Sequence, residues 1–238
     1  MKKYLIAIFL GLVFSNVSFA GLPLITDDFK TVEKGKFVLD LGSFSSQSSY
    51  DFSSNHEVSM QIIYGLLNNM DLGINVPYSL GNPAGLMDAE INSKVKILSF
   101  GQDEGISMKA ILKLANADSS SGLGSGLNDY SVLFISSKRF GSVLTHYNLG
   151  YTIVGVPSGL PNSNKINFGF AIEKEIYPSA NMMFEIYGNS VVSYQSYVNC
   201  QIASNWQVND FYKVCVGYSV DIDNNSQDIS TIGVTFYF

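Results

Sequence analysis

The sequence predicts an all-β fold, an antiparallel transmembrane β-barrel of about twelve strands with both termini in the periplasm. Three observations predict it. Apolar and polar residues alternate along many consecutive segments, the first residues resemble an export signal, and the last segment ends on the aromatic residue Phe238. Alternation with a period of two gives a strand two different faces, as a sheet between two environments requires.

Residues 1–20 have the features of a secretory signal peptide. Lys2 and Lys3 precede an apolar run from Tyr4 to Phe14, and the small residues Ser18 and Ala20 follow it. The run is shorter than the roughly 20 apolar residues that a membrane-spanning helix needs. We therefore expect export in a Gram-negative bacterium, with cleavage after Ala20.

The composition excludes several classes of function. The formal net charge is −6, and it becomes −8 when Lys2 and Lys3 leave with the signal. Proteins that bind nucleic acid cluster their Lys and Arg residues, so no nucleic-acid partner is expected. The His and Cys residues show no spacing typical of a metal site. We expect no metal and no cofactor.

Alternation is clearest between Met70 and Leu80. Leu72, Ile74 and Val76 fall on one face, and Asp71 and Asn75 fall on the other. Similar segments recur, and most have the length of about ten residues that a tilted membrane strand needs. The predicted strands are 36–45, 56–66, 70–80, 87–98, 106–115, 129–138, 142–153, 165–175, 181–189, 194–204, 211–221 and 229–238.

The connections between these strands alternate in length. Short links are predicted at 67–69, 139–141, 177–180 and 206–210, with a slightly longer one at 100–105. Longer polar loops are predicted at 46–55, 116–128, 154–164 and 221–227. Membrane barrels have short periplasmic turns and longer outer loops. The chain is thus divided into a signal peptide (1–20), an N-terminal periplasmic or plug segment (21–34) and a barrel (35–238).

A soluble β-sandwich would share part of this pattern, but the position of the aromatic residues favours the barrel. Tyrosines are predicted on the apolar face near strand ends, where a girdle at the membrane interface belongs. They are Tyr64, Tyr78, Tyr130, Tyr151, Tyr212 and Tyr218. The same alternation places Cys200 with the apolar set and Cys215 with the polar set, so both cysteines are expected to be free thiols.

The C-terminal strand carries a candidate assembly signal. Phe236 and Phe238 alternate with polar or small residues, and the chain stops at Phe238. A final strand of this kind resembles the signal that the bacterial barrel-assembly machinery reads. The expected partners are therefore this machinery, the outer-membrane lipid and lipopolysaccharide around the barrel, and a small-molecule solute.

Several motifs, taken together, resemble those of a known family. They are Pro23-Leu24-Ile25-Thr26-Asp27-Asp28, Gly35-Lys36-Phe37, Tyr64-Gly65-Leu66 with Leu72-Gly73, Val76-Pro77-Tyr78, Gly85-Leu86-Met87-Asp88, and Gly122-Leu123-Gly124-Ser125-Gly126 before Asp129. In this order the chain resembles the outer-membrane β-barrel family named after the meta-pathway of phenol degradation. The resemblance implies a membrane barrel that acts as a transporter or uptake channel.

The polar faces of the strands predict which residues line the lumen. These residues are Asp40, Glu57, Asp71, Lys94, Lys96, Lys109, Lys113, Glu173, Glu185 and Lys213. The lysines of two neighbouring strands would form a basic side, which the acidic residues would face. Two interpretations remain open. The charges either create a transverse field that orients solutes, or they pair with one another and close a narrow lumen.

Asp27 and Asp28 suggest a role for the segment before the first strand. The segment could fold into the lumen as a plug near the lysines, or it could be a loose periplasmic tail. The sequence does not choose between them.

The function predicted from the sequence is passive uptake of small, hydrophobic or aromatic solutes by a porin-like outer-membrane channel or transporter. One alternative is a closed structural barrel without a pore. Another is an outer-membrane lipid hydrolase, which would use a histidine, His56 or His146, with a serine nucleophile. Neither histidine has a nucleophile at a recognisable spacing, so we expect no catalytic residues and no enzyme.

Overall fold

Segments of alternating polarity pair into one antiparallel sheet in the computed structural model of the chain. The structure describes residues 21–48, 54–159, 163–191, 196–223 and 227–238. The predicted signal peptide and its cleavage after Ala20 lie outside the described residues. Within these ranges, no helix combines the length and hydropathy needed to cross a bilayer.

In the described ranges, twelve long strands and one short strand make up the sheet. The long strands are β1 (Phe37–Ser48), β2 (Ser54–Leu67), β3 (Met70–Ser79), β5 (Glu90–Ser99), β6 (Gly105–Lys113), β7 (Asp129–Phe140), β8 (Val143–Ile153), β9 (Lys165–Tyr177), β10 (Ala180–Val191), β11 (Tyr197–Asn209), β12 (Tyr212–Asp221) and β13 (Gln227–Tyr237). The short strand is β4 (Gly85–Leu86), and a single 3₁₀ turn, η1, spans Ser119–Ser121. Each predicted strand corresponds to one long strand.

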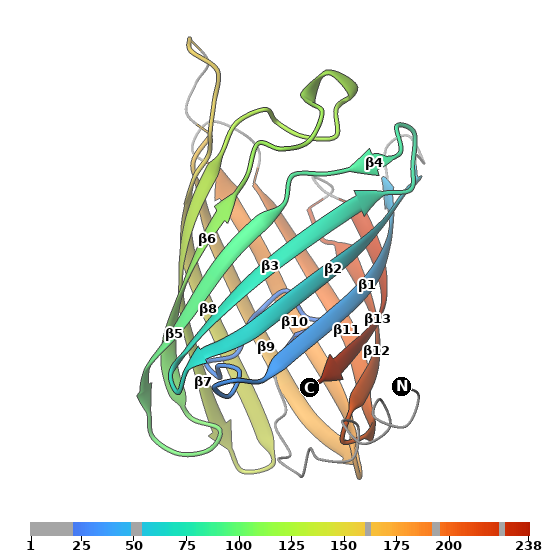
Figure 1. Cartoon of the computed structure of the whole chain (residues 1–238). Helices are drawn as coiled ribbons and strands as arrows, with labels where there is room; N and C mark the ends of the chain where they lie inside the picture. Colours follow the sequence, from blue (N-terminus) through green and yellow to red (C-terminus); the bar gives the residue numbers. More distant parts are fainter. Residues whose placement is uncertain (1–20, 49–53, 160–162, 192–195, 224–226) are drawn as a thin grey trace, which may run out of the picture.

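The sheet closes on itself (Figure 1). Consecutive long strands pair throughout, and β1 pairs with β13, so that the first and last strands are neighbours. In this pairing Val38 lies opposite Tyr237, and Phe37 and Phe238 exchange backbone hydrogen bonds at 3.0 and 2.9 Å. Closure gives each long strand of the described part of the chain a partner on both sides. The predicted fold class, a closed antiparallel barrel of twelve strands, is therefore confirmed.

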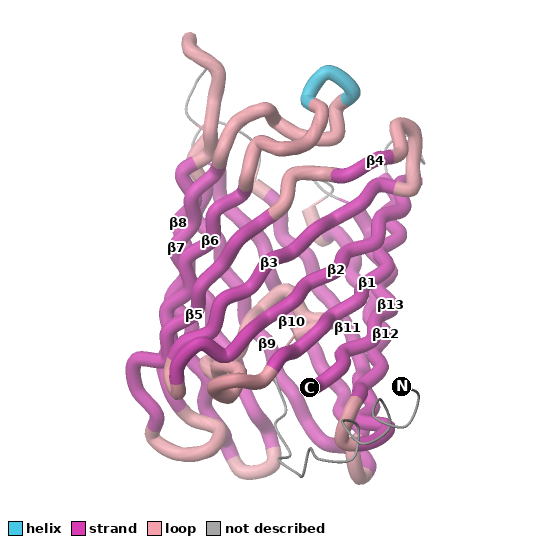
Figure 2. The backbone as a smooth tube through the Cα atoms, viewed as in Figure 1, coloured by secondary structure: helices cyan, strands magenta, loops and turns pink. Residues whose placement is uncertain are grey.

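The two rims of the barrel differ. The start of β1, the end of β13 and the short connections lie at one rim, which we call the turn rim. The longer connections, including β4 and η1, lie at the other, which we call the loop rim (Figures 1 and 2). The predicted alternation of short and long connections is present in the structure.

Burial along the strands is the reverse of that in a soluble protein. On β8, the inward His146, Asn148 and Thr152 are at most 9% exposed. The outward Leu149 is 60% exposed, and Ile153 is 54% exposed. Polar side chains thus fill the inside of the sheet and apolar side chains cover the outside, as in a membrane barrel.

Aromatic side chains gather near both rims on the outer face. Tyr78, Tyr130, Tyr151 and Tyr218 are exposed toward the loop rim, as the sequence predicts. Tyr64 and Tyr212 are only half-buried toward the turn rim, because their rings pack against Phe37 and Phe236. The turn rim adds an exposed set that the predicted tyrosine girdle does not include: Phe37, Phe100, Phe140, Tyr177, Trp206, Phe211 and Phe238.

The predicted strand 87–98 begins too early. The ladder of β5 starts at Glu90, and residues 88 and 89 are held by the loop between β6 and β7. The carboxylate of Asp88 accepts the backbone N–H of Ala117 and Ser125, at 3.1 and 3.0 Å, and Ala89 donates to Asn116 at 2.8 Å. Side-chain oxygen atoms here accept hydrogen bonds in place of a neighbouring strand. The alternation of polar and apolar residues therefore extends beyond the residues that pair in the sheet.

The predicted link at 206–210 is too long. Trp206 pairs with Ala180 in the ladder, and β11 continues to Asn209 through an irregularity in its pairing with β12. The extra residue of a bulge breaks the alternation without ending the strand. The prediction for the cysteines is confirmed: Cys200 and Cys215 are free, and Cys200 lies on the outer face while Cys215 is buried on the inner one.

Candidate functional site

Residues 21–36, which we call the N-terminal segment, run through the lumen before β1 begins. The segment contacts inward side chains of β3, β5, β6, β7, β10 and β11, which lie on opposite walls of the barrel. In Figures 1 and 2 it passes between the walls in the half nearer the turn rim. The segment therefore fills part of the lumen.

Carboxylates of the barrel bind the backbone of the segment. Glu185 on β10 accepts the N–H groups of Ile25, at 3.1 Å, and of Thr26. Asp71 on β3 accepts the N–H of Val32 at 3.0 Å. A buried backbone N–H group needs a hydrogen-bond acceptor, and the extended segment offers none for these three N–H groups. The carboxylates of Glu185 and Asp71 supply the acceptors.

Neutral polar groups hold the segment at further points. Ser137 Oγ on β7 accepts the N–H of Phe29 at 3.1 Å, and Gln201 on β11 donates to the carbonyl of Pro23 at 2.7 Å. The side-chain amide of Asn148 on β8 is oriented to accept the N–H of Asp27 at 2.7 Å and to donate to its carbonyl at 2.9 Å. Side chains of β7, β8 and β11 thus fix the path of the segment.

Glycines of the inner wall make room for the segment. A Cβ atom at Gly65, Gly105 or Gly169 would collide with Glu33 and Val32, with the Phe29 ring, and with Thr26, respectively. At Gly233 a Cβ would lie 2.9 Å from Leu22. Each of these glycines leaves the space into which one part of the segment fits.

Several apolar side chains of the segment are buried in the lumen, with Leu24 and Phe29 the largest of them. Leu24 packs in a cluster with Ala171, Met183 and Ala203. Phe29 is 2% exposed and lies against Gly105. Removing these side chains from water stabilises the docked segment, on the order of 2 kcal/mol for each fully buried large side chain.

Asp27 joins the segment to the basic side of the lumen. Its Oδ1 lies 3.0 Å from Nζ of Lys94, and its Oδ2 lies 2.9 Å from Nζ of Lys109. Burial alone would raise the pKa of Asp27, but the two ammonium groups outweigh it and hold this pKa well below its ordinary value. Asp28 lies 3.7 Å from Lys94, so both acids predicted for a plug are brought to the lysines.

A second ion pair ties the segment to the turn rim. Lys30 Nζ lies 2.8 Å from Asp103, which also accepts from Arg139 Nε at 2.8 Å. Burial opposes ionisation of Asp103, but Lys30 and Arg139 hold its pKa below the ordinary value. The connection between β5 and β6 thereby closes over the segment.

The remaining predicted lumen residues do not all join this site. Asp40, Glu173 and Lys213 are buried on the inner wall, and Asp40 accepts from the Thr235 hydroxyl. Lys113 lies 2.7 Å from Asp129 and 3.7 Å from Asp88 near the loop rim. Glu57 and Lys96 are half-buried. The ion-pair partners of Lys94, Lys109 and Lys113 are thus the segment and acids near the loop rim, rather than the acids of the opposite wall.

Phe236 and Phe238, the predicted assembly signal, lie at the turn rim. Their ring centroids are 6.4 Å apart, and that of Phe236 lies 6.1 Å from Tyr212. Phe238 is 48% exposed. They form part of the outer aromatic band of this rim.

His146 does have a serine neighbour, which the sequence analysis missed. Its Nδ1 lies 2.8 Å from Ser137 Oγ, and its Nε2 lies 3.6 Å from Glu173. The three residues come together because Ser137 and His146 are cross-strand partners on β7 and β8. His146 is only 1% exposed, and the Ser137 hydroxyl also accepts the N–H of Phe29. The group therefore anchors the segment and is enclosed by it.

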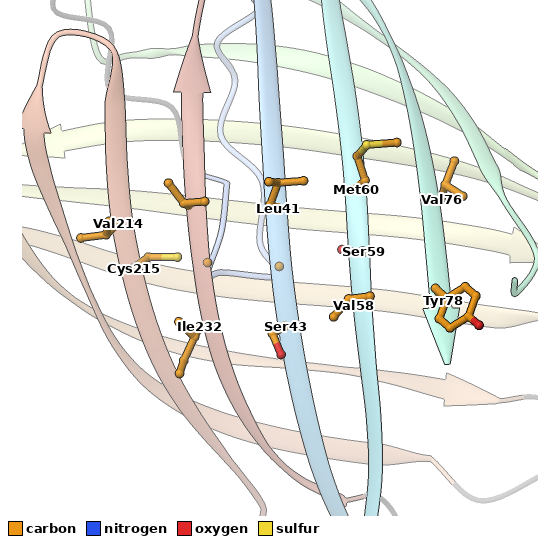
Figure 3. A pocket seen from close by; sticks show the side chains of 13 residues that line it. Leu41, Ser43, Val58, Ser59, Met60, Val76, Tyr78, Val214, Cys215 and Ile232 are labelled. Carbon is orange, nitrogen blue, oxygen red and sulfur yellow. The ribbon is translucent and has the colours of Figure 1, made fainter. Parts of the chain in front are cut away.

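The outer face carries an apolar groove of about 670 Å³ over β12, β13, β1, β2 and β3 (Figure 3). Leu41, Met60, Val76, Tyr78, Val214 and Ile232 contribute its side chains. The paired Gly42 and Gly233 lie at its floor, and Leu22 of the segment lies on the inner side of the same wall. The groove belongs to the continuous apolar exterior.

Sequence reasoning assigned no role in the lumen to Ser137, Asn148, Gln201 or the wall glycines. A signal was present, because all of these residues except Gly105 occupy inward positions of predicted strands. The wall of an empty lumen would require neither a side-chain amide nor a glycine at these positions. Alternation assigns the face of a residue but not its partner. Their common partner is a segment far away in sequence.

Comparison with known proteins supports the fold. No family model matches the chain, and no curated protein matches it in sequence. The chain is similar in structure to an outer membrane channel from Pseudomonas putida F1, with a TM-score of 0.69 and 10% identity over 89% of this chain and 98% of that one. This likeness is one of architecture.

Two porins are also similar. The NanC porin gives a TM-score of 0.65 with 11% identity, over 83% of this chain and 98% of that one. The KdgM porin gives 0.60 with 12% identity, over 84% and 99%. At such identities the comparisons establish the barrel and carry no residue roles.

Proposed function

We propose that this chain is an outer-membrane channel for passive uptake of small solutes, and that its N-terminal segment is a plug. One observation carries the proposal: a closed barrel has apolar side chains outside, polar side chains inside, and its own N-terminal segment docked in the lumen. Such a barrel is matched to lipid outside and to water and solutes inside.

The signal peptide and the C-terminal aromatic residues support the location. An exported barrel reaches the outer membrane through the assembly machinery, for which Phe236 and Phe238 are the proposed signal. The exposed aromatic bands at both rims and the apolar groove between them suit contact with lipid and lipopolysaccharide. The fold similarity to porins and an outer membrane channel supports the same assignment.

The solute class remains a proposal from the sequence. The resemblance to the family named after phenol degradation suggests small, hydrophobic or aromatic solutes. The side chains of Leu24 and Phe29 are buried in apolar subsites of the lumen. Solutes with an apolar moiety would bind in these subsites after the segment has left them.

One observation favours the alternative of a closed structural barrel. The segment and the buried polar groups around it occupy the half of the lumen toward the turn rim. In that alternative the plug never leaves, and the protein conducts nothing.

Swelling of liposomes that contain the purified protein tests the proposal. We expect swelling in small neutral solutes at a rate that falls with solute size, because a barrel of this strand number has a narrow interior. Protein-free liposomes and liposomes with a heat-denatured sample are the controls. Absence of swelling, together with absence of current steps in planar bilayers, would overturn the channel assignment and favour the closed barrel.

A further inference from the structure

Two lysines face each other directly on the inner wall. Lys94 on β5 and Lys109 on β6 are cross-strand partners in the antiparallel register. Their side chains are 9% and 17% exposed. Like charges directly opposite each other destabilise a sheet, and the low exposure strengthens their repulsion. An anion between the two ammonium groups offsets this repulsion.

The anion present is a carboxylate held by both oxygens. Oδ1 of Asp27 accepts from Lys94 and from the backbone N–H of Asp28, at 3.0 and 2.9 Å, and Oδ2 accepts from Lys109 at 2.9 Å. In the described part of the chain, Asp27 is the sole ion-pair partner of Lys109. The two ammonium groups thus match the two oxygens of one carboxylate.

This carboxylate belongs to the segment and not to the wall. Other contacts hold the segment independently of it, including the acceptors Glu185 and Asp71. A displaced Asp27 would leave both lysines in place, since each is fixed to a strand. A second carboxylate could then take the same position.

We propose that the Lys94–Lys109 pair is a binding site for small organic carboxylates that enter the lumen, and that Asp27 occupies it as a resident ligand. The inference rests on the proposed channel function and names a solute class for it. Asp27 is tethered to the barrel, so it competes for the two lysines as if it were present at about millimolar concentration or above. A free carboxylic acid therefore binds there weakly and reversibly. Weak binding suits passive flux, which requires solutes to leave as well as enter.

Chemical rescue of an Asp27→Ala variant tests the site. Removing the carboxylate leaves the two lysines with a space that formate can fill. Thermal unfolding is measured in detergent, in sodium formate and in sodium chloride at equal ionic strength. With formate at about ten times its dissociation constant, the melting temperature of D27A should rise by about 3–6 °C relative to chloride.

The matched controls are the wild-type protein, whose site is occupied, and D27A with Lys109→Gln, whose clamp is incomplete. Formate should leave both unchanged relative to chloride. An equal rise in all three proteins, or a rise in none, would overturn the proposal. Should D27A not fold in chloride, its refolding yield in formate replaces the melting temperature as the readout, with the same expected order.

The outcomes separate the site from the channel function. Rescue by formate in a protein that never conducts would retain the carboxylate site and reject the channel. Conduction without rescue would retain the channel and reject the site. The melting temperature makes this separation possible, because it does not depend on current through the barrel.

Discussion

Deletion of residues 21–34 is expected to raise the single-channel conductance several-fold. The segment carries Leu24 and Phe29 into the lumen and turns Asp27 toward the lysines, so its removal empties the space it occupies. The strands remain paired, since Phe37 still bonds Phe238 at the junction of β1 and β13. Planar-bilayer recording of the intact and shortened mature proteins measures the difference.

The control for this deletion changes a segment outside the lumen. Replacing Ser119–Ser121, the exposed turn η1, with glycines should leave the conductance unchanged, because none of its residues is buried. Equal conductance in the deleted and intact proteins would show that the segment does not restrict the path. The plug assignment would then be wrong even in a barrel that conducts.

The substitution Leu149→Arg should cost about 2–4 kcal/mol of the free energy of unfolding in lipid vesicles. Leu149 lies near the centre of β8, is 60% exposed on the outer face, and is the cross-strand partner of Phe134 and Phe168. A guanidinium there would meet hydrocarbon in place of water. Urea unfolding of protein refolded into phosphatidylcholine vesicles measures the change.

Leu149→Ala is the matched control, because it shortens the side chain and keeps it apolar. In a soluble domain, a position this exposed would tolerate arginine within about 0.5 kcal/mol. Equal stability of the two variants would therefore contradict a lipid-facing outer surface. Lower stability of the arginine variant alone supports it.

Most of the barrel could be predicted from the sequence, because its main determinant is local. Alternation along β8 assigns His146 and Asn148 to one face and Leu149 to the other without knowledge of any other strand. The boundaries were less predictable. At Asp88 side-chain hydrogen bonds replace the pairing with a neighbouring strand, and at Gln207 a bulge shifts the register. Neither feature alters the local amino-acid composition, so the sequence pattern does not reveal it.

The candidate site was predictable only in part. Alternation assigned Lys94 and Glu185 to the inner wall, but their partners depend on the path of the N-terminal segment. That path has no period, and it is fixed by tertiary contacts such as the fit of Thr26 at Gly169. The family resemblance stays a prediction, since the comparisons support the fold alone.

A disulfide between the segment and the wall tests the central claim most directly. A Cβ built at Gly169 lies 3.3 Å from Cβ of Thr26, close to the separation of about 3.5–4.5 Å across a disulfide. The pair Thr26→Cys and Gly169→Cys is made in a protein with Cys200→Ser and Cys215→Ser, and single-channel current is recorded before and after reduction. The account predicts that the bridge forms. The oxidised protein should show no channel openings as large as those of the chain lacking residues 21–34, and reduction should restore large openings. A bridge that does not form, or an oxidised protein that conducts as well as the chain lacking residues 21–34, would contradict it.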